Sequence, residues 1–481
     1  MTSEWQRERE IDVRRRLDDT IKASNKPRVV IIGGGFAGIN LAKRLDSSLF
    51  QIVLLDKNNH HVFQPLLYQV ATAGLEPEAI CSPVRKILDR KKNFHFRMVN
   101  VERVDRNERL VLTDSGPLTF DYLVIATGAA THFFGNADFE RRTLPLKDIG
   151  DALALRNHLF EVLETAIKEP DPETRKSLMH VVVVGGGPTG VEVAGAIAEL
   201  KRHVIGKDYP DLAVDELQII LLEGMSKLLT DMSDLAGEKA LTYLTRMGVT
   251  VHLNTRSTRY DGHTLSLDDG SSICSRTVIW AAGVKPVLLP GFEQNSIERG
   301  RIKVNVFSQV LAEAPGRYFD NIFAIGDVSL LRSEDWPEGL PGMAPVAIQQ
   351  GRRLASNLNR TQLGQLPRPF TFTDKGTMAT IGRNCAVAEM KRRFVLSGFI
   401  GWVTWMVVHL WYLIGFRNKV IVSIDWLWNY FTYDRGVRAI IHPSGSMSQE
   451  QLPQPTDRSH AFKRAPSSSP PRRRSEVREE R

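Results

Sequence analysis

The chain is poor in cysteine, with only Cys81, Cys274 and Cys385 among its 481 residues. No two of them form a CxxC pair, and none belongs to a cluster with metal-ligand spacing. A disulfide framework and a dithiol redox centre are therefore disfavoured as a basis for function. We expect each cysteine to be a small buried apolar residue.

The N-terminus lacks the hydrophobic core of a secretion signal and is instead highly charged through Lys26. This pattern predicts a charged extension over residues 1–26 and a cytoplasmic location for the folded body. The net charge of +8 is partly concentrated in a basic Ser/Pro-rich tail, residues 442–481, whose composition predicts disorder. Because no aromatic–basic platform or recognition motif accompanies this charge, we expect no nucleic-acid partner.

Charge is absent from one stretch near the C-terminus, SGFIGWVTWMVVHLWYLIGF, residues 397–416. Basic residues flank it at 391–393, Arg417 and Lys419, an arrangement that suits anionic lipid headgroups. About 20 apolar residues can cross a bilayer, so spanning, docking on one leaflet and burial in a dimer core all stay open. The next segment, VIVSIDWLWNYFTYDR (420–435), is rich in Trp and Tyr, which prefer the headgroup interface. We favour docking on one leaflet.

A helical wheel of this uncharged stretch separates small from bulky side chains. The small or short residues of one narrow face are Ser397, Gly401, Thr404, Val408 and Gly415. The bulky residues opposite are Phe399, Trp402, Met406 and Leu413. We expect the small face to pack on the protein and the bulky face to meet acyl chains.

A glycine-rich motif follows directly on the first apolar strand pattern of the chain. RVVIIGGGFAG (28–38) supplies Gly33, Gly35 and Gly38, and the next strand pattern, QIVLLD, ends at Asp56. The first glycine permits a tight turn, the second lets the backbone approach a pyrophosphate, and the third lets the helix pack on the strand. An acid at the end of the second strand can hold a ribose hydroxyl, so the whole pattern predicts a dinucleotide site.

The same motif occurs a second time. VVVVGGGPTG supplies Gly185, Gly187 and Gly190, and the strand pattern LQIILLE ends at Glu223. Glu223 lies further along than the usual spacing of about 20 residues, so residues 203–215 are an insertion or an extended helix end. Two motifs favour two bound dinucleotides, with a duplicated scaffold as the alternative.

Three further segments resemble the remaining signatures of the two-dinucleotide-binding-domain flavoproteins, which have the glutathione-reductase-like α/β fold. They are DYLVIATGA (121–129), TVIWAAGVKP (277–286) and NIFAIGDVS (321–329). The resemblance implies that the first motif binds FAD and the second binds NAD(P)H. It also implies that turns at Thr127, Gly128, Gly283, Gly326 and Asp327 contribute to cofactor binding.

By the same resemblance, the FAD-binding domain is discontinuous. It comprises residues 27–147 and 289–385, with an NADH-binding domain inserted at 148–288 and a membrane-associated helical region following at 386–441. Glu223 would accept a hydrogen bond from the ribose 2′-hydroxyl of NADH and repel the 2′-phosphate of NADPH. Gly224 stands where an NADPH enzyme could place an arginine, and although Lys227 is close in sequence, we favour NADH.

A closer resemblance, covering about residues 27–441, is to the type II NADH:quinone oxidoreductases. It is carried by DKNNHHVFQPLLYQVAT (56–72), GPTGVEVAGAIAEL (187–200), LPGMAPVAIQQG (340–351), DKGTMATIGR (374–383) and the hydrophobic C-terminus. The resemblance implies FAD-dependent oxidation of NADH with electron transfer to a membrane quinone and without proton pumping. It also implies a peripheral enzyme on the cytoplasmic face of the cell membrane. A homodimer, a reductase for a soluble carrier and a non-catalytic redox-responsive flavoprotein stay open.

The resemblance also suggests roles for individual residues. Glu192 matches the family glutamate beside the stacked nicotinamide and flavin, and Gln64 with Pro65 matches the loop against the flavin ring. Lys375 matches a turn near the flavin, and Gln349 matches the last glutamine of the family quinone motif AQxAxQ.

This sequence departs from that quinone motif at one position. Pro345 replaces the first glutamine, which is often assigned to the quinone headgroup, and a proline offers no side-chain hydrogen bond. Either the quinone is therefore held differently, or the electron acceptor is a different one. Elsewhere, His60 and His61 are adjacent without a second ligand cluster, which favours loop packing over metal binding, and we expect no metal.

Overall fold

The computed structural model describes residues 17–312, 314, 316–390, 394–432 and 437–441. Most of the expected N-terminal extension, the basic residues 391–393 and the tail from 442 onward lie outside these ranges, as does the end of the aromatic segment at 433–435. The described residues up to Ile440 belong to one compact unit.

A six-stranded sheet forms the first half of the fold, with the order β22-β23-β9-β1-β2-β5. Its strands are β1 (Arg28–Ile32), β2 (Gln51–Asp56), β5 (Phe94–Met98), β9 (Tyr122–Ile125), β22 (Gln309–Leu311) and β23 (Tyr318–Ala324). All neighbours pair in parallel except β22, which pairs antiparallel with β23 at the edge. Strands from two distant parts of the chain therefore build one sheet.

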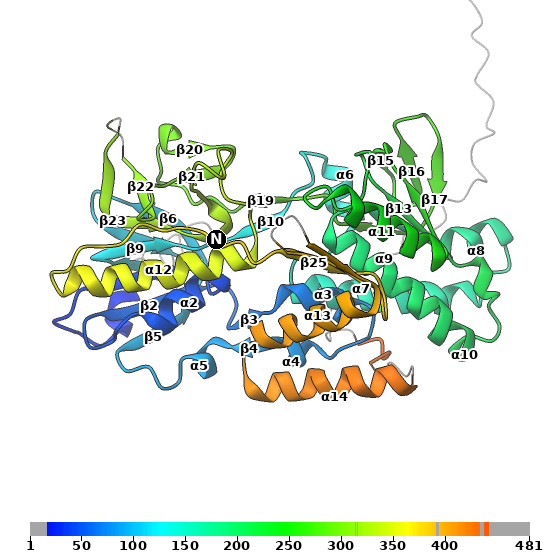
Figure 1. Cartoon of the computed structure of the whole chain (residues 1–481), viewed down its shortest axis with the longest axis horizontal. Coiled ribbons are helices and arrows are strands. Elements are labelled where there is room, and N and C mark those ends of the chain that lie inside the picture. Colours follow the sequence, from blue (N-terminus) through cyan, green and yellow to red (C-terminus); the bar gives the residue numbers. More distant parts are fainter. Residues whose placement is uncertain (1–16, 313, 315, 391–393, 433–436, 442–481) are drawn as a thin grey trace, which may run out of the picture. The chain divides into compact units, whose positions relative to one another are not determined.

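Helices α2 (Phe36–Arg44) and α12 (Ala344–Gln362) lie side by side against this sheet (Figure 1). Val29, Val30 and Ile31 of β1 are completely buried. Burial on both faces is what a continuous run of apolar β-branched residues predicts for a parallel sheet covered by helices.

A second sheet of five parallel strands lies between these two parts in sequence, with the order β11-β18-β12-β13-β14. Its strands are β11 (Leu144–Pro145), β12 (His180–Val184), β13 (Gln218–Leu222), β14 (Val249–His252) and β18 (Thr277–Trp280). Helix α9 (Pro188–Leu200) follows β12, as α2 follows β1. It continues through a π-helical turn (Lys201–Ile205) into α10 (Gly206–Asp208), so the long spacing before Glu223 includes an extended helix end. The expected α/β fold with two Rossmann-like units is confirmed.

Further helices and small sheets complete the two halves. The helices are α3 (Leu67–Ala71), α4 (Pro77–Ile80), α5 (Val84–Ile87), α6 (Ala137–Arg142), α7 (Ile149–Ala166), α8 (Pro172–Leu178) and α11 (Asp234–Arg246). The small antiparallel sheets are β3 (His60–Val62) with β4 (Cys81–Pro83), β10 (Ala129–Thr131) with β19 (Val284–Pro286), β6 (Val101–Asp105) with β7 (Leu110–Thr113) and β8 (Gly116–Thr119), and β15 (Ser257–Tyr260) with β16 (Thr264–Leu267) and β17 (Ser272–Cys274). A mixed sheet contains β20 (Ile297–Glu298), β21 (Arg301–Lys303) and β24 (Ser329–Leu330).

An antiparallel sheet of β25 (Thr377–Thr380), β26 (Ala386–Met390) and β27 (Phe394–Ser397) lies between α12 and the C-terminal helices in the sequence. Helix α13 (Gly398–Tyr412) packs on β26, and α14 (Phe416–Thr432) follows after a short turn (Figure 1). No helix in the described ranges has the length and apolar character needed to cross a bilayer.

The expected orientation of α13 was only partly right. Gly401 does pack closely on the body, since a Cβ there would lie 2.8 Å from the carbonyl oxygen of Ala386. The expected lipid-facing residues Trp402, Met406 and Leu413 instead pack against the core. The reason is that the buried stripe runs along Gly401, Trp405, His409 and Leu413, so α13 presents a wider, bulkier face to the body than the small residues alone predicted.

The expectation of buried cysteines was wrong for Cys274, which is exposed on β17. Cys81 and Cys385 are half-buried, and burial raises the pKa of the Cys81 thiol to about 12. A thiol with so high a pKa is a poor nucleophile at neutral pH.

Candidate functional site

The first glycine motif forms a tight turn between β1 and α2. Gly33 has φ +109°, and a Cβ there would lie 2.2 Å from the carbonyl oxygen of Ala126. A Cβ on Gly38 would lie 1.9 Å from the carbonyl oxygen of Gly33, so helix and turn meet without room for any side chain. Gly35, in contrast, has no atom within 4 Å of its Cβ position and faces open space. A cradle closed at its ends and open at the middle glycine fits a pyrophosphate.

The second motif repeats this geometry between β12 and α9. Gly185 has φ +110°, and a Cβ on it would lie 2.6 Å from the carbonyl oxygen of Ala281. A Cβ on Gly190 would lie 1.8 Å from the Gly185 carbonyl oxygen, whereas Gly187 again faces open space. The chain therefore contains two cradles of matching shape, and both fit a dinucleotide.

The acids at the ends of the second strands hold these turns. The Gly34 N–H donates to Oδ2 of Asp56 at 2.5 Å, and the Gly186 N–H donates to Oε2 of Glu223 at 2.6 Å. Glu223 also accepts from the Met225 N–H at 2.8 Å. Because each carboxylate oxygen has two acceptor positions, both acids can still accept from a ribose hydroxyl.

An arginine that the sequence did not single out lies beside Glu223. The Arg256 side chain comes within 3.0 Å of the Cβ position of Gly224, the residue that follows Glu223. A cation is therefore present next to the acid, but from a loop more than 30 residues away in sequence. No local motif could have predicted that approach.

The turns at the ends of β9 and β18 lie where the chain passes between the two halves. The Thr127 hydroxyl donates to the carbonyl oxygen of Val287 at 2.6 Å, and the Val287 N–H donates to that of Gly128 at 3.0 Å. In the second turn, the carbonyl oxygen of Gly283 accepts from the His132 N–H at 3.0 Å. These bonds fix both turns at the carboxyl edges of the parallel strands, where α/β proteins bind ligands.

Gly326 and Asp327 form the turn after β23, and a buried glutamine holds it. Gly326 has φ +77°, and its N–H donates to Oε1 of Gln350 at 2.7 Å. Gln350 lies on α12 and also hydrogen-bonds to the Ser329 hydroxyl. The sequence motif pointed to the neighbouring Gln349 and gave Gln350 no role, because only the packing of α12 decides which of the two points inward.

Lys147 lies near both Gln64 and Asp327. Its amine lies 3.5 Å from Oε1 of Gln64, and Gln64 donates weakly to the Lys147 carbonyl oxygen at 3.4 Å. Burial lowers the pKa of Lys147, and the attraction of Asp327 partly opposes this shift. Pro65 follows Gln64 in a short 3-10 helix, Gln64–Leu66, which forms this part of the loop.

The region corresponding to the quinone motif forms the first turns of α12. Pro345 lies in the first turn, where the backbone N–H has no helical partner, so proline fits there without loss of a hydrogen bond. The amide of Gln349 is engaged with the backbone of Thr373: it donates to the carbonyl oxygen at 3.0 Å and accepts from the N–H at 3.1 Å. Gln349 thereby links α12 to the segment that leads to Lys375.

Glu192 lies buried where α9, β25 and α13 meet. Burial raises its pKa to about 8, against the opposing effects of the Thr380 backbone and the Trp405 indole, which favour the charged form. The indole Nε1–H of Trp405 faces the carboxyl without forming a well-aligned hydrogen bond. Its ring stacks on His409, with centroids 4.0 Å apart, and the His409 ring meets Phe63 edge-on at 6.1 Å. A protonatable carboxyl thus lies beside Trp405 of the C-terminal region.

Lys375 and His61, two further residues that the sequence pointed to, each have a polar neighbour. Lys375 is exposed, with its amine 3.4 Å from the Tyr412 hydroxyl at the end of α13. His61 is buried, and its Nδ1 lies 3.0 Å from the carbonyl oxygen of Gly34 in the first cradle. Within the described ranges, no group of three or more His, Cys, Asp or Glu side chains could hold a metal ion.

Comparison with known proteins adds family membership to this geometry. The family described as Pyridine nucleotide-disulphide oxidoreductase matches residues 27–351, and the NDH2 C-terminal domain matches residues 375–433. Type II NADH:quinone oxidoreductase Ndh of Mycobacterium tuberculosis is 34% identical over 432 residues, covering 87% of this chain and 91% of that protein. NdhA of the same organism is 35% identical over 431 residues, covering 86% and 89%.

Among solved structures, NDH2 from Plasmodium falciparum in complex with NADH shares the fold, with a TM-score of 0.78 and 22% identity. The match covers 87% of this chain and 100% of that one. This chain thus combines two glycine cradles, two parallel sheets and C-terminal helices, and its sequence relatives are type II NADH:quinone oxidoreductases. The chain belongs to the type II NADH:quinone oxidoreductases.

Proposed function

We propose that this chain oxidises NADH through bound FAD and passes the electrons to a membrane quinone, without pumping protons. The observation that carries the proposal is the pair of matching cradles, since one chain with two dinucleotide sites can hold a flavin and a nicotinamide together. Bound in its cradle, FAD would supply the redox chemistry that couples hydride removal from NADH to reduction of a quinone by two electrons and two protons. The protein's part is to bind the two cofactors, to align their reacting rings and to exclude water from between them.

We assign the two cradles to different cofactors. The proposed FAD residues are Gly33, Gly35, Gly38, Asp56, Gln64, Pro65, Thr127, Gly128, Gly326 and Asp327. The proposed NADH residues are Gly185, Gly187, Gly190, Glu223 and Gly283. The hydrogen bonds of Asp56 and Glu223 to their glycine turns support this assignment, because they keep each carboxylate within reach of a ribose. The domain boundaries 27–147 with 289–385, and 148–288, follow the same division.

Glu192, Gln349 and Lys375 are proposed to serve the reaction site. Glu192 is buried, and its raised pKa keeps it largely protonated at neutral pH, so it can donate a hydrogen bond toward a bound ring. Gln349 fixes the segment that carries Lys375, and Lys375 lies against Tyr412 of α13. Since the Gln349 amide is already engaged with backbone, its role is to position that segment.

A lipid-soluble acceptor is supported by the outward faces of α13 and α14. Both helices carry a stripe of exposed large apolar side chains at helical spacing: Ile400, Val403, Val407 and Trp411 on α13, and Phe416, Val420, Ile424, Leu427, Trp428 and Phe431 on α14. Adjacent helices with such stripes form a surface that suits the interface of a bilayer. We call these ten residues the apolar face, and we propose that it docks on one leaflet.

The proposed side is the cytoplasmic face of the cell membrane. The described cations Arg417 and Lys419 border the apolar face, and the cytoplasmic leaflet is the one rich in anionic lipids. Homodimerisation stays a prediction, to be tested by the molar mass of the purified protein in solution.

Quinone-dependent turnover tests the proposal. Purified FAD-loaded protein is mixed with NADH, and flavin bleaching and its reversal by menadione are followed by stopped flow. Rapid bleaching followed by rapid menadione-dependent reoxidation is expected. Rapid reduction of a soluble ferredoxin-type carrier without quinone reduction would instead identify a soluble-carrier reductase, and bleaching without reoxidation by either acceptor would indicate a non-catalytic flavoprotein.

A further inference from the structure

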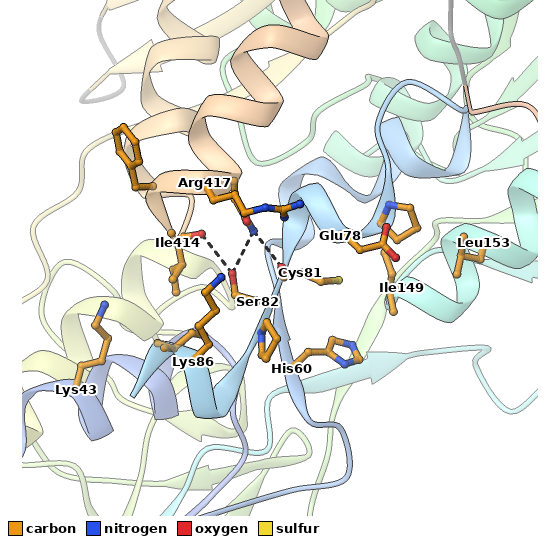
Figure 2. Close-up of a pocket in the computed structure, with 16 residues that line it drawn as sticks. Lys43, His60, Glu78, Cys81, Ser82, Lys86, Ile149, Leu153, Ile414 and Arg417 are labelled. Atoms are coloured by element: carbon orange, nitrogen blue, oxygen red, sulfur yellow. Dashed lines mark hydrogen bonds between the residues drawn. The ribbon is translucent and has the colours of Figure 1, made fainter. Parts of the chain in front are cut away.

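A cavity of about 630 Å³ lies beside the turn between α13 and α14. Its walls come from α2, the paired strands β3 and β4, α4, α5, the start of α7 and residues Ile414–Asn418 (Figure 2). Small-molecule sites in proteins occupy about 300–1,000 Å³, so this cavity has room for a ligand. It is separate from the residues to which we assign FAD and NADH.

Strand β3 separates the cavity from the first glycine cradle. Successive side chains on a strand point to opposite faces. His61 accordingly approaches the carbonyl oxygen of Gly34 in the cradle, whereas His60 lines the cavity. Lys43, another lining residue, lies about two turns along α2 from the cradle, or roughly 10 Å at the rise of a helix.

Three cations from three different elements line this cavity: Lys43 of α2, Lys86 of α5 and Arg417 of α14. All three side chains are exposed, and none forms an ion pair with any residue that the structure describes. Glu78 is the one acidic lining residue, and Figure 2 shows it beside Ile149, at the end of the cavity away from Lys43. The lining therefore carries a net formal charge of +2 with His60 neutral.

The wall formed by the α13–α14 turn is held firmly in place. The Ser82 hydroxyl donates to the carbonyl oxygen of Ile414 at 3.3 Å, and the Asn418 amide donates to the carbonyl oxygen of Cys81 at 3.0 Å and to Ser82 Oγ at 3.2 Å. Figure 2 shows these bonds joining the turn to β4. A site whose walls are fixed before binding loses less entropy when a ligand enters.

The cavity also borders the apolar face. Phe416, 84% exposed, belongs to that face and directly precedes Arg417. Moreover, much of the cavity wall is apolar, and Pro77, Ile149 and Leu153 are among its lining residues. A ligand that matches both features has an anionic head and an apolar tail.

We infer that this cavity binds the phosphodiester headgroup of an anionic phospholipid of the membrane on which α13 and α14 dock. Lys43, Lys86 and Arg417 face the phosphate, and the acyl chains extend along the apolar face beside Phe416. The inference rests on the proposed membrane docking, but it assigns a discrete, saturable lipid site where docking requires only a general apolar surface. A bound lipid would fix the protein's orientation on the leaflet.

Binding of a soluble short-chain lipid tests the site without requiring docking or turnover. FAD-loaded full-length protein in non-ionic detergent is titrated calorimetrically with dihexanoyl phosphatidylglycerol, and saturable binding of one lipid per chain is expected. Dihexanoyl phosphatidylcholine should bind much more weakly, because its headgroup carries no net charge. Equal binding of the two lipids, or the absence of saturation, would overturn the inference.

Variants locate the site. The triple variant Lys43→Gln/Lys86→Gln/Arg417→Gln should weaken phosphatidylglycerol binding by at least about tenfold. Pro83→Trp, which fills the cavity from an exposed lining position and keeps all three charges, should also abolish it. Flavin content and the unfolding curve report whether each variant is folded. Binding unchanged in both variants would refute the assignment.

A matched control removes the same charge elsewhere. Lys168→Gln/Lys176→Gln/Arg259→Gln replaces three exposed cations of the other half of the molecule, and this variant should bind the lipid within about twofold of the native protein.

Two competitors test whether the cavity binds a different ligand. Displacement of the lipid by inorganic phosphate at comparable concentration would assign the site to free phosphate, and displacement by menadione would assign it to the quinone; either result would overturn the lipid assignment.

Discussion

Glu192 offers the sharpest test of the site, because its burial makes a stability prediction with a definite sign. Its carboxyl has an ordinary pKa of 4.5, and burial raises the pKa to about 8 in the folded protein. The folded state therefore holds a proton that the unfolded state releases as pH rises. Stability from this group is fully present below pH 4.5 and is lost progressively up to about pH 8.

The size of the effect follows from that interval. One pH unit corresponds to about 1.4 kcal/mol per proton, so the full interval from 4.5 to about 8 is worth about 5 kcal/mol and the part below pH 7 about 3 kcal/mol. Glu192→Gln keeps the shape of the side chain and removes its titration. The free energy of unfolding of Glu192→Gln minus that of the native protein should therefore rise by about 1.4 kcal/mol per pH unit between these limits.

Denaturant unfolding of FAD-loaded protein from pH 5 to pH 9 measures this difference, with tryptophan and flavin fluorescence as separate probes. Glu238→Gln, the same replacement at an exposed position on α11, is the matched control. A carboxylic-acid infrared band that persists at pH 7 in native protein and disappears in Glu192→Gln gives a readout that does not depend on unfolding. Parallel pH–stability curves for native protein and Glu192→Gln would refute the reasoning.

Three further predictions concern the cofactor sites. Gly38→Ala should sharply lower the flavin-to-protein absorbance ratio, because its Cβ would lie 1.9 Å from the Gly33 carbonyl oxygen; native flavin content would contradict the close packing. Gln350→Leu should cost about 1–3 kcal/mol of unfolding free energy by leaving the Gly326 N–H buried without its acceptor, and an unchanged denaturation midpoint would exclude that role. Glu223→Gln should raise kcat/KM for NADPH relative to NADH by about tenfold, whereas unchanged selectivity would remove Glu223 from the nicotinamide site.

The glycine cradles show how far local sequence can predict a site. Gly33 and Gly38 are five residues apart, and the contact that forbids a side chain runs from one to the other. Such a constraint lies within one strand–turn–helix unit, so spacing alone reveals it. The acids at Asp56 and Glu223 were predictable for a related reason, since parallel neighbours end at the same edge of a sheet.

Residues that depend on packing between distant segments were not predictable in this way. The sequence places Gln349 and Gln350 side by side, and only the contact of α12 with the turn after β23 shows that Gln350 is the buried one. Arg256 reaches Gly224 from a separate loop. The helical wheel of α13 also failed at Trp402, because a wheel describes one helix and contains no information on the breadth of the surface that receives it.

The two dinucleotide motifs, the family resemblance and the uncharged C-terminal stretch could all be read from the sequence, because each depends on local spacing or composition. How that stretch is used depends on the packing of the folded chain. Residues 397–416 are divided between the end of β27, helix α13, a turn that is hydrogen-bonded to β4 and the first residue of α14, and Trp405 lies beside Glu192. The same packing also gathers Lys43, Lys86 and Arg417 around one cavity. Those contacts join residues hundreds of positions apart, and only the folded chain brings them together.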